Sequence, residues 1–234
     1  MINIFTNLDL LKSIEEYTNL RNLCDTCLSF YTLKKYINYK LNREYSLLYY
    51  YDASFRSNIL NKISDPYKQL YIDLSDCESI TDVSSLDNVH YLDLSECENI
   101  EDVSGLKRVY HLNLSGCINI SDVTSLAYVY YLDLSCCDNV SDVSPLGNVK
   151  YLILSNCENI DDVDGLKNVY HLDLSGCENV SDVSALGNVT YLDLSGCINI
   201  TNVDALGKVT YLYLCGCENI TNFDALDNVY HLEL

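Results

Sequence analysis

The sequence predicts an α/β repeat solenoid: a right-handed coil with a parallel β-sheet on its concave face and a 3₁₀ or extended back, preceded by an α-helical cap. Three observations predict this fold. One 20-residue unit recurs eight times across residues 67–234, and its apolar residues keep one spacing throughout. Before residue 67 that spacing gives way to a helical period. We therefore divide the chain into a helical cap, 1–66, and eight repeats plus a terminal strand, 67–234.

The apolar spacing defines the shape of one unit. The single step of two in each unit predicts a short strand with alternate side chains facing inward. The steps of three that make up the rest suit a tight coil. Because one turn of such a coil cannot bury its own apolar side, we expect successive turns to stack and bury it jointly. In one unit the predicted core residues are Leu106, Val109, Leu112, Leu114, Cys117, Ile120 and Val123.

These residues carry a family resemblance. The pattern VxxLxLxxCxxI is similar to the leucine-rich repeat motif, with Cys where that motif often has Asn, and it covers about residues 70–234. The segment DVSALGNV also looks like the corresponding part of internalin-type repeats. The resemblance implies a parallel sheet and a protein-binding function. The unit is short for this family, which implies a 3₁₀ or extended back.

Composition restricts the partners. The chain has 234 residues, with 14 basic and 34 acidic side chains and a net charge of −20. Residues 67–234 hold 27 of the acidic residues and only six of the basic ones. Such a charge repels phosphate backbones and anionic lipid surfaces, so nucleic acid and membranes are not expected partners. The start of the sequence lacks the pattern of a secretion signal, and we expect an intracellular protein with reduced thiols.

Two columns of chemically active side chains recur every 20 residues. A metal site, a disulfide framework or a packing rule could each explain the cysteines, but a single file lacks the paired motifs of zinc sites. We predict buried thiols that donate to backbone carbonyls where the chain leaves the strand, and no metal or cofactor. We expect the Asp/Asn column to provide N-caps of helical turns. The cysteines are Cys77, Cys97, Cys117, Cys137, Cys157, Cys177, Cys197 and Cys217, and the caps begin at Asp82 and end at Asn222.

The outward positions of the strands form the candidate binding face. They combine aromatic, acidic and hydroxyl side chains, which suits a protein partner with a basic surface; alternatively, they only keep the sheet soluble. Ile153 and Tyr213 interrupt the row of aspartates and are the leading contact candidates. The predicted partner-binding residues are Tyr91, Asp93, His111, Tyr131, Asp133, Tyr151, Ile153, His171, Asp173, Tyr191, Asp193, Tyr211 and Tyr213.

The histidines of this face do not predict an enzyme. His171, Asp173 and Ser175 share one predicted strand, but neighbouring outward side chains project in parallel and form no catalytic triad. The 60-residue recurrence of His111, His171 and His231 instead indicates duplication of a three-repeat block, because GLKRVYHL and GLKNVYHL are near copies.

The first part of the chain is predicted to be helical, including residues 31–41 and 42–51, with a last turn at 52–60 that covers the first repeat. The segment NLRNLCDTCLSFYTL, residues 19–33, resembles the second half of an F-box. With the repeats, the whole chain resembles F-box and leucine-rich repeat proteins of giant amoebal viruses. This resemblance implies a Skp-type adaptor and a substrate-recognition role in a ubiquitin ligase; the alternative is a purely structural cap. The implied adaptor-binding residues are Leu8, Leu11, Ile14, Leu20 and Leu23.

The last predicted strand has no capping turn after it, and an open strand edge is a template for pairing with another chain. The sequence therefore also predicts self-association, as a homodimer or a larger assembly. The residues concerned are Tyr211, Tyr213, His231, Leu232 and Leu234.

Overall fold

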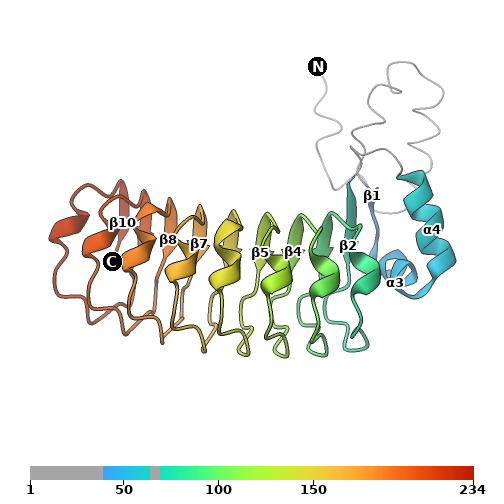
Figure 1. Cartoon of the computed structure of the whole chain (residues 1–234), viewed down its shortest axis with the longest axis horizontal. Coiled ribbons are helices and arrows are strands. Elements are labelled where there is room, and N and C mark those ends of the chain that lie inside the picture. Colours follow the sequence, from blue (N-terminus) through green and yellow to red (C-terminus); the bar gives the residue numbers. More distant parts are fainter. Residues whose placement is uncertain (1–38, 64–68) are drawn as a thin grey trace, which may run out of the picture. The chain divides into compact units, whose positions relative to one another are not determined.

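A computed structural model of the chain describes residues 39–63 and 69–234. This part of the chain contains two α-helices, ten short strands and eight 3₁₀ turns, and it forms two compact units. The first unit contains the described residues up to Leu74 together with Asn88–Asp93, and the second contains Ser75–Asp87 and Leu94–Leu234. Figure 1 labels the elements along the chain.

The first unit begins with strand β1, Tyr39–Lys40, where we had predicted a helix over 31–41. That prediction is wrong at these two residues. The Tyr39 N–H donates to the Gln69 carbonyl and the Leu41 N–H to the Tyr71 carbonyl, so β1 pairs in parallel with β2, Leu70–Asp73. Strand β3, Tyr91–Asp93, pairs with β2 on the other side. A sheet edge supplied by residues 30 positions away has overridden the local helical pattern.

The helix predicted for 42–51 is confirmed, whereas the last turn predicted for 52–60 is instead a helix of ten residues. Helix α3, Arg43–Tyr51, begins after Asn42, whose side chain accepts the Tyr45 N–H. Helix α4, Ala53–Lys62, begins after Asp52, which accepts two backbone N–H groups. Each cap satisfies donors that the first helical turn leaves free. Asp52 thus both ends α3 and starts α4.

The second unit is a stack of 20-residue coils, as Figure 1 shows. Its strands pair in parallel with neighbours in chain order, and each register step is 20 residues, as in Leu132 opposite Leu152. They are β4 (His111–Asn113), β5 (Tyr131–Asp133), β6 (Tyr151–Ile153), β7 (His171–Asp173), β8 (Tyr191–Asp193), β9 (Tyr211–Tyr213) and β10 (His231–Glu233). The predicted parallel sheet is confirmed.

The back of each coil is a short 3₁₀ turn, which confirms the other half of the predicted fold class. The turns are Ser84–Leu86, Ser104–Leu106, Thr124–Leu126, Ser144–Asn148, Asp164–Leu166, Ser184–Asn188, Asp204–Leu206 and Asp224–Leu226. Every apolar position predicted for the unit that begins at Leu106 is buried. Fully burying side chains of this size contributes about 1.5–3 kcal/mol each.

The cysteine column is part of this core, as predicted. The Cys157 thiol is fully buried and donates to the Leu134 carbonyl at 3.1 Å, at the point where the chain leaves strand β5. The same bond, with lengths of 3.0–3.2 Å, is made by Cys117, Cys137, Cys177, Cys197 and Cys217. Burial raises the pKa of the Cys157 thiol to about 12, so it is a neutral donor at neutral pH. Each thiol is therefore a second donor to a core carbonyl that also accepts a backbone N–H, as the Leu134 carbonyl does from Cys137.

The third residue after each of strands β2–β9 has a left-handed backbone. In one coil this residue is Gly176, with a φ of 73°, and in three other coils it is Glu96, Cys136 or Asn156, with φ of 57–59°. A non-glycine residue in this conformation costs roughly 1–2 kcal/mol. This backbone conformation explains the glycine at position 176.

Replacing Cys157 with Ala tests the thiol–carbonyl bond. We expect a loss of about 1–2 kcal/mol in the free energy of unfolding, because the substitution opens a small cavity and removes the thiol donor, so that the Leu134 carbonyl keeps only its bond from the Cys137 N–H. Urea denaturation measures this loss, and Cys136→Ala at the exposed cysteine provides the control. Equal effects of both substitutions would contradict a structural role for the buried thiol.

Candidate functional site

The candidate site of the second unit is the outward face of strands β4–β10. In each strand the central Leu points into the core, and in β4–β8 the two flanking residues are half-buried on the outward face. The first strand residues form an aromatic column: His111, Tyr131, Tyr151, His171, Tyr191, Tyr211 and His231. The third residues of the strands form a second column, called the acidic column although three of its members are not acidic: Asn113, Asp133, Ile153, Asp173, Asp193, Tyr213 and Glu233. The parallel register brings the predicted residues of this unit together.

The rings of the aromatic column are not evenly stacked. His111 lies on Tyr131 with ring centroids 4.0 Å apart and planes at 3°, and His171 lies on Tyr191 at 3.9 Å and 6°. The following pairs are wider: 6.3 Å for Tyr131 with Tyr151 and 6.2 Å for Tyr191 with Tyr211. Stacked aromatic pairs contribute roughly 0.5–1.5 kcal/mol beyond the area they bury. Along the column, each closed pair is followed by two wider spacings, which include 5.7 Å for Tyr151 with His171 and 6.0 Å for Tyr211 with His231.

The carboxylates of the acidic column are held by the backbone. One oxygen of Asp133 accepts the Ser135 N–H at 2.9 Å, and Asp173 and Asp193 make the same bond to Ser175 and Ser195. Among the described residues, no Lys or Arg forms an ion pair with these three carboxylates. The charges are therefore fixed in position and half-buried, without a cation from this part of the chain.

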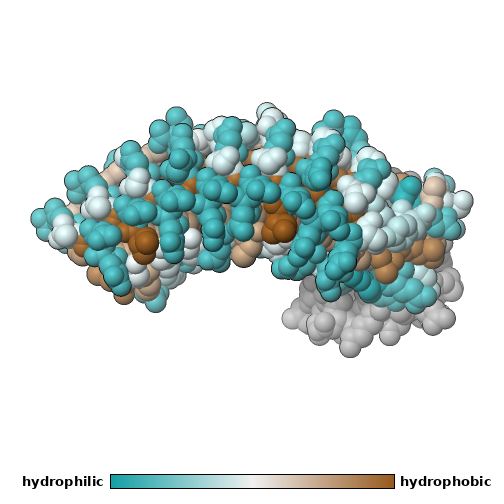
Figure 2. Space-filling view, turned by 90° about the horizontal axis from the view of Figure 1, so that it is seen from below, coloured by the Kyte–Doolittle hydropathy of each residue, from teal (hydrophilic) through white to brown (hydrophobic). Residues whose placement is uncertain are grey.

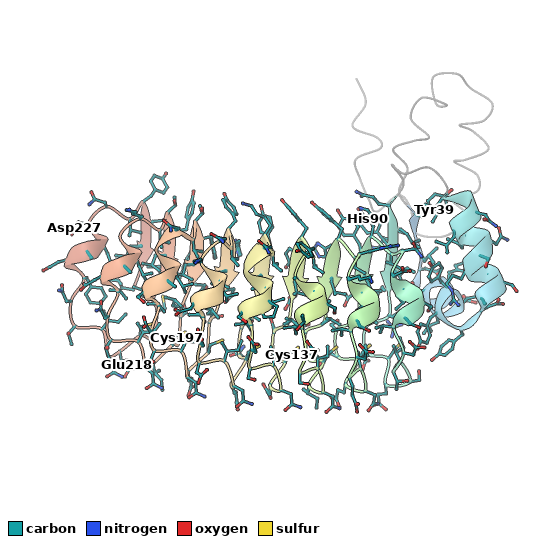
Figure 3. All side chains as sticks on the ribbon, in the orientation of Figure 1. Tyr39, His90, Cys137, Cys197, Glu218 and Asp227 are labelled. Carbon is teal, nitrogen blue, oxygen red and sulfur yellow. The ribbon has the colours of Figure 1, made fainter. Side chains whose placement is uncertain are left out.

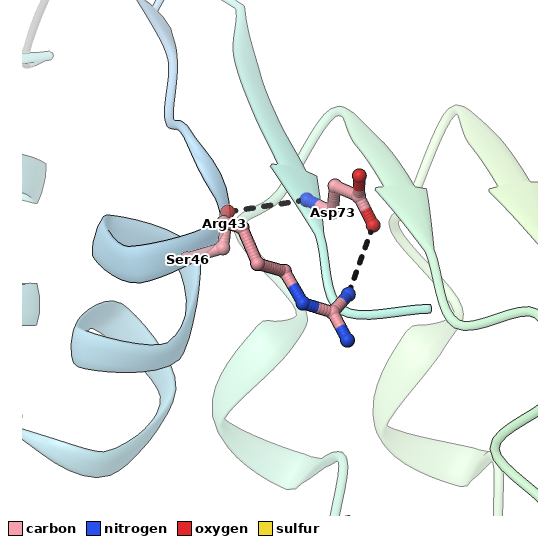
Figure 4. Close-up of polar contacts among 3 residues, drawn as sticks. All are labelled: Arg43, Ser46 and Asp73. Atoms are coloured by element: carbon pink, nitrogen blue, oxygen red, sulfur yellow. Dashed lines mark hydrogen bonds and ion pairs between the residues drawn. The ribbon is translucent and has the colours of Figure 1, made fainter. Parts of the chain in front are cut away.

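In the first unit, the equivalent carboxylate has a basic neighbour. Figure 4 shows the Arg43 guanidinium 3.2 Å from the Asp73 carboxylate, while the Asp73 N–H donates to the Ser46 hydroxyl. Beside this ion pair, Tyr71 and Tyr91 stack at 4.0 Å. An arginine on helix α3 thus supplies a guanidinium to the acidic position of this repeat.

The residues that directly precede the strands form a further column of side chains, the flanking column. The spacing of apolar residues in the sequence did not predict it. Tyr110 and Tyr130 stack at 4.6 Å, and Tyr170 makes an edge contact with Tyr151 at 5.9 Å. The ammonium of Lys150 lies 3.9 Å from the centre of the Tyr170 ring, a cation–π contact. Figure 3 shows aromatic side chains projecting from the edge where the strands begin, with His90 at this position in the first unit.

A signal for the flanking column was present in the sequence. The motifs VYHL and VYYL place two aromatic residues in succession at the start of a strand. The spacing of apolar residues assigned no role to the first of them. In the structure the chain turns outward one residue earlier, and Tyr110, Tyr130 and Tyr170 are each 38% exposed.

A second acidic column belongs to the turns and not to the face. Asp142 accepts the Ser144 N–H at 3.0 Å and the Ser144 hydroxyl at 2.6 Å, and every repeat has an equivalent backbone bond. The N-cap prediction is wrong by one residue, because the N-cap of each 3₁₀ turn is the following apolar residue, Val143 in this case, which makes no side-chain cap bond. A valine side chain has no acceptor, and the aspartate before it accepts the N–H of the first turn residue instead.

The electrostatics of the face follow from partial burial. Burial lowers the pKa of His171, against the opposing effect of Asp173, so the imidazole stacked on Tyr191 is neutral at neutral pH. Burial and a hydrogen bond with Tyr213 raise the pKa of Tyr191 to about 12. The formal charge of the face at neutral pH therefore comes from its carboxylates.

Other surfaces of the described residues are weaker candidates for a binding site. Figure 2, viewed from below, shows a largely hydrophilic surface with small hydrophobic patches. Ile118 and Ile198 are each 40% exposed, and isolated apolar residues of this kind are normal on a surface. Within residues 39–63 and 69–234, no three His, Cys, Asp or Glu side chains are grouped as a metal site. No helix in that part of the chain is both long and apolar enough to span a bilayer.

The remaining predicted residues fall in two groups. Leu8, Leu11, Ile14, Leu20 and Leu23, with the F-box-like segment 19–33, lie outside the described residues. Of the residues predicted to self-associate, Tyr211, His231 and Leu234 are exposed, whereas Tyr213 and Leu232 are half-buried. Self-association stays a prediction.

Comparisons with known proteins support the fold. No protein-family model matches the sequence, and no curated protein matches it. Among solved structures, an internalin, InlF, from Listeria monocytogenes is similar, with a TM-score of 0.56 and 22% identity over 78% of this chain. The match covers 57% of the internalin chain, so this chain spans little more than half its length. The leucine-rich repeat-containing protein LegL7 from Legionella pneumophila has a TM-score of 0.42 and 20% identity, covering 82% of this chain and 76% of that one.

The coil geometry and the similarity to InlF define the class: the fold is a leucine-rich repeat solenoid. The similarity to internalin-type repeats inferred from DVSALGNV agrees with this result at the level of the fold. At 22% identity the similarity to InlF concerns the fold alone.

The capping aspartates predict a specific pH dependence. Hydrogen bonds from Ser144 lower the pKa of Asp142, and bonds from the equivalent Ser or Thr lower the pKa of Asp82, Asp102, Asp122 and Asp182. A carboxyl whose pKa is lowered on folding stabilises the fold above its unfolded pKa of about 3.9 and loses this contribution as the pH falls through its folded pKa. We therefore expect Asp142→Ala to destabilise the protein at neutral pH and progressively less below about pH 4.

Urea denaturation of both proteins across this pH range measures the difference in free energy of unfolding. A difference that grows as the pH falls would contradict the capping role. Asp162→Asn, which keeps the side-chain oxygen that Asn202 uses in the same way, is the matched control and is expected to stay close to the wild type.

Proposed function

We propose that this chain is a protein-binding module that uses the outward face of strands β4–β10 to hold a partner rich in Arg and Lys. The observation that carries the proposal is that two basic residues of the chain already make contacts of this kind, one with a carboxylate and one with an aromatic ring. Arg43 pairs with Asp73 in the first unit, and Lys150 lies over the Tyr170 ring in the second. A partner that supplied the same groups to Asp133, Asp173 and Asp193 would repeat contacts that this chain makes.

Charge supports this choice of partner. Strands β2–β10 contain no Lys or Arg, while the chain carries a net charge of −20. A surface of one sign attracts partners of the other sign and speeds their encounter. Because the carboxylates are half-buried and held by backbone N–H groups, they lose little freedom when a guanidinium binds.

The aromatic column supports binding affinity. Tyrosine combines a large apolar ring with a hydroxyl and is enriched among the residues that dominate binding energy in interfaces. The rings also accept cations on their faces, as Tyr170 does with Lys150. Two kinds of contact are thus available to each basic residue of a partner, a carboxylate and a ring.

Two triple variants test the proposal with the same change in charge. The first is Asp133→Asn, Asp173→Asn and Asp193→Asn on the face, and the second is Glu98→Gln, Glu158→Gln and Glu178→Gln at exposed turn positions. Asn is tolerated on the face, because Asn113 accepts the Ser115 N–H as the aspartates do. The probe is a fluorescently labelled Arg-rich peptide.

We expect the face variant to weaken binding of this peptide by about tenfold or more, because each of its three substitutions removes a fixed, half-buried charge. The turn variant should change it by less than about threefold, since exposed charges contribute little. Fluorescence anisotropy measures both dissociation constants. Equal weakening in the two variants would show only general attraction to an acidic protein and would refute the proposal.

The narrower form of the function, a substrate receptor of a Skp-type ubiquitin ligase, rests on the F-box resemblance of residues 19–33. In this form the F-box-like segment holds the adaptor while the sheet face holds the target. We expect a purified Skp adaptor to be retained by the immobilised chain and lost on Leu20→Asp with Leu23→Asp. The face variant described above, which leaves this segment unchanged, is the control. No retention by the wild type would leave the segment as a structural cap.

A further inference from the structure

The outward face repeats with a second, longer period. Besides the 20-residue unit, its composition repeats after 60 residues, which is three strands. The first block has His111 with Asn113, Tyr131 with Asp133, and Tyr151 with Ile153. The second block has His171 with Asp173, Tyr191 with Asp193, and Tyr211 with Tyr213. In both blocks a large apolar or aromatic residue replaces the aspartate on the third strand.

The geometry of the rings has the same long period. Each block begins with a closed pair, His111 on Tyr131 or His171 on Tyr191, at 3.9–4.0 Å. Each closed pair is followed by two wider spacings, 6.3 and 5.7 Å in the first block and 6.2 and 6.0 Å in the second. The first wide spacing of each block, between β5 and β6 or between β8 and β9, has the same place in the long period, and we call it a gap. At the second gap the Tyr213 ring also contacts Tyr191, with ring centroids 5.1 Å apart.

Each gap has the chemistry to hold one basic side chain. Asp133 lies opposite Ile153 in the parallel register, and Asp193 lies opposite Tyr213. A carboxylate therefore stands beside a tilted pair of rings on one side and an apolar or aromatic side chain on the other. An arginine can place its guanidinium on the carboxylate and its aliphatic stem on the apolar neighbour. We define these two places as subsite A, with Asp133 and Ile153, and subsite B, with Asp193 and Tyr213.

The distance between the subsites selects the ligand. Three strand spacings of about 4.8 Å separate them by roughly 14 Å. An extended peptide advances about 3.3 Å per residue and points alternate side chains to the same side, so only even separations present two side chains to one face. Four residues span roughly 13 Å, whereas two span about 7 Å and six about 20 Å.

We propose that the partner segment is extended, crosses the strands of the sheet, and places two basic side chains four residues apart in subsites A and B. This inference rests on the proposed function, because it assumes that the outward face binds a basic partner. To the proposed function it adds the number of basic residues that are bound, their spacing and the conformation of the partner segment. Asp173, between the two subsites, contributes to attraction along the path of the peptide.

A series of peptides of equal length and charge tests the spacing. Each carries two arginines in a Gly, Ser and Gln background, separated by two, three, four, five or six residues, and a further peptide carries one arginine. NMR titration of the full chain at low ionic strength measures affinity and location together. We expect the four-residue spacing to bind at least about tenfold more tightly than the one-arginine peptide, because the second contact is intramolecular. Its shifts should be concentrated in strands β5, β6, β8 and β9.

Variants of the two subsites complete the test. Asp133→Asn and Asp193→Asn should each reduce the affinity of the four-residue peptide to about that of the one-arginine peptide, and Asp173→Asn should reduce it less. Affinity that is independent of spacing, with the face triple variant still weaker than the turn triple variant, would overturn the two-subsite inference and leave the proposed function standing. Affinities that ignore the face substitutions altogether would overturn both.

Discussion

Stacking of coils is the constraint on which the second unit depends. A single 20-residue coil has too few residues to enclose its own leucines and valines, so each coil is folded only against its neighbours. The step from one coil to the next is uniform, as in Leu132 opposite Leu152. The Cys157 thiol shows how strict this requirement is, because it donates to a carbonyl of the preceding coil while filling core volume. One added or missing residue would displace both partners.

This uniform core separates structural from functional variation. Core positions hardly vary between coils, because every coil meets the same neighbours. Outward positions are free to differ, since neither stacking nor backbone hydrogen bonding depends on their size. The departures from the repeat at Ile153, Tyr213 and Lys150 therefore carry more information about a ligand than the repeat itself.

Acidic residues serve two unrelated purposes in the fold. Asp142 and its equivalents hold the start of the 3₁₀ turns, and hydrogen bonding lowers their pKa values. Asp133 and Asp193 also accept backbone N–H groups, but they stand beside aromatic rings on the outward face of the strands. The net charge of −20 thus combines capping with a directed binding surface.

The spacing of apolar residues in the sequence is enough to predict the period, the strands of the repeats, the buried cysteines and the two outward columns of those strands. These features follow from a pattern that recurs in every coil, so an irregular residue in one coil does not obscure it. The tertiary structure alone showed the flanking column and the strand at Tyr39–Lys40, the latter because its pairing partner lies 31 residues away. It also decided which rings close into pairs and which leave gaps, and it placed Lys150 over Tyr170. Such contacts depend on ring tilt and on where the chain bends before each strand, and neither is encoded in the spacing of apolar residues.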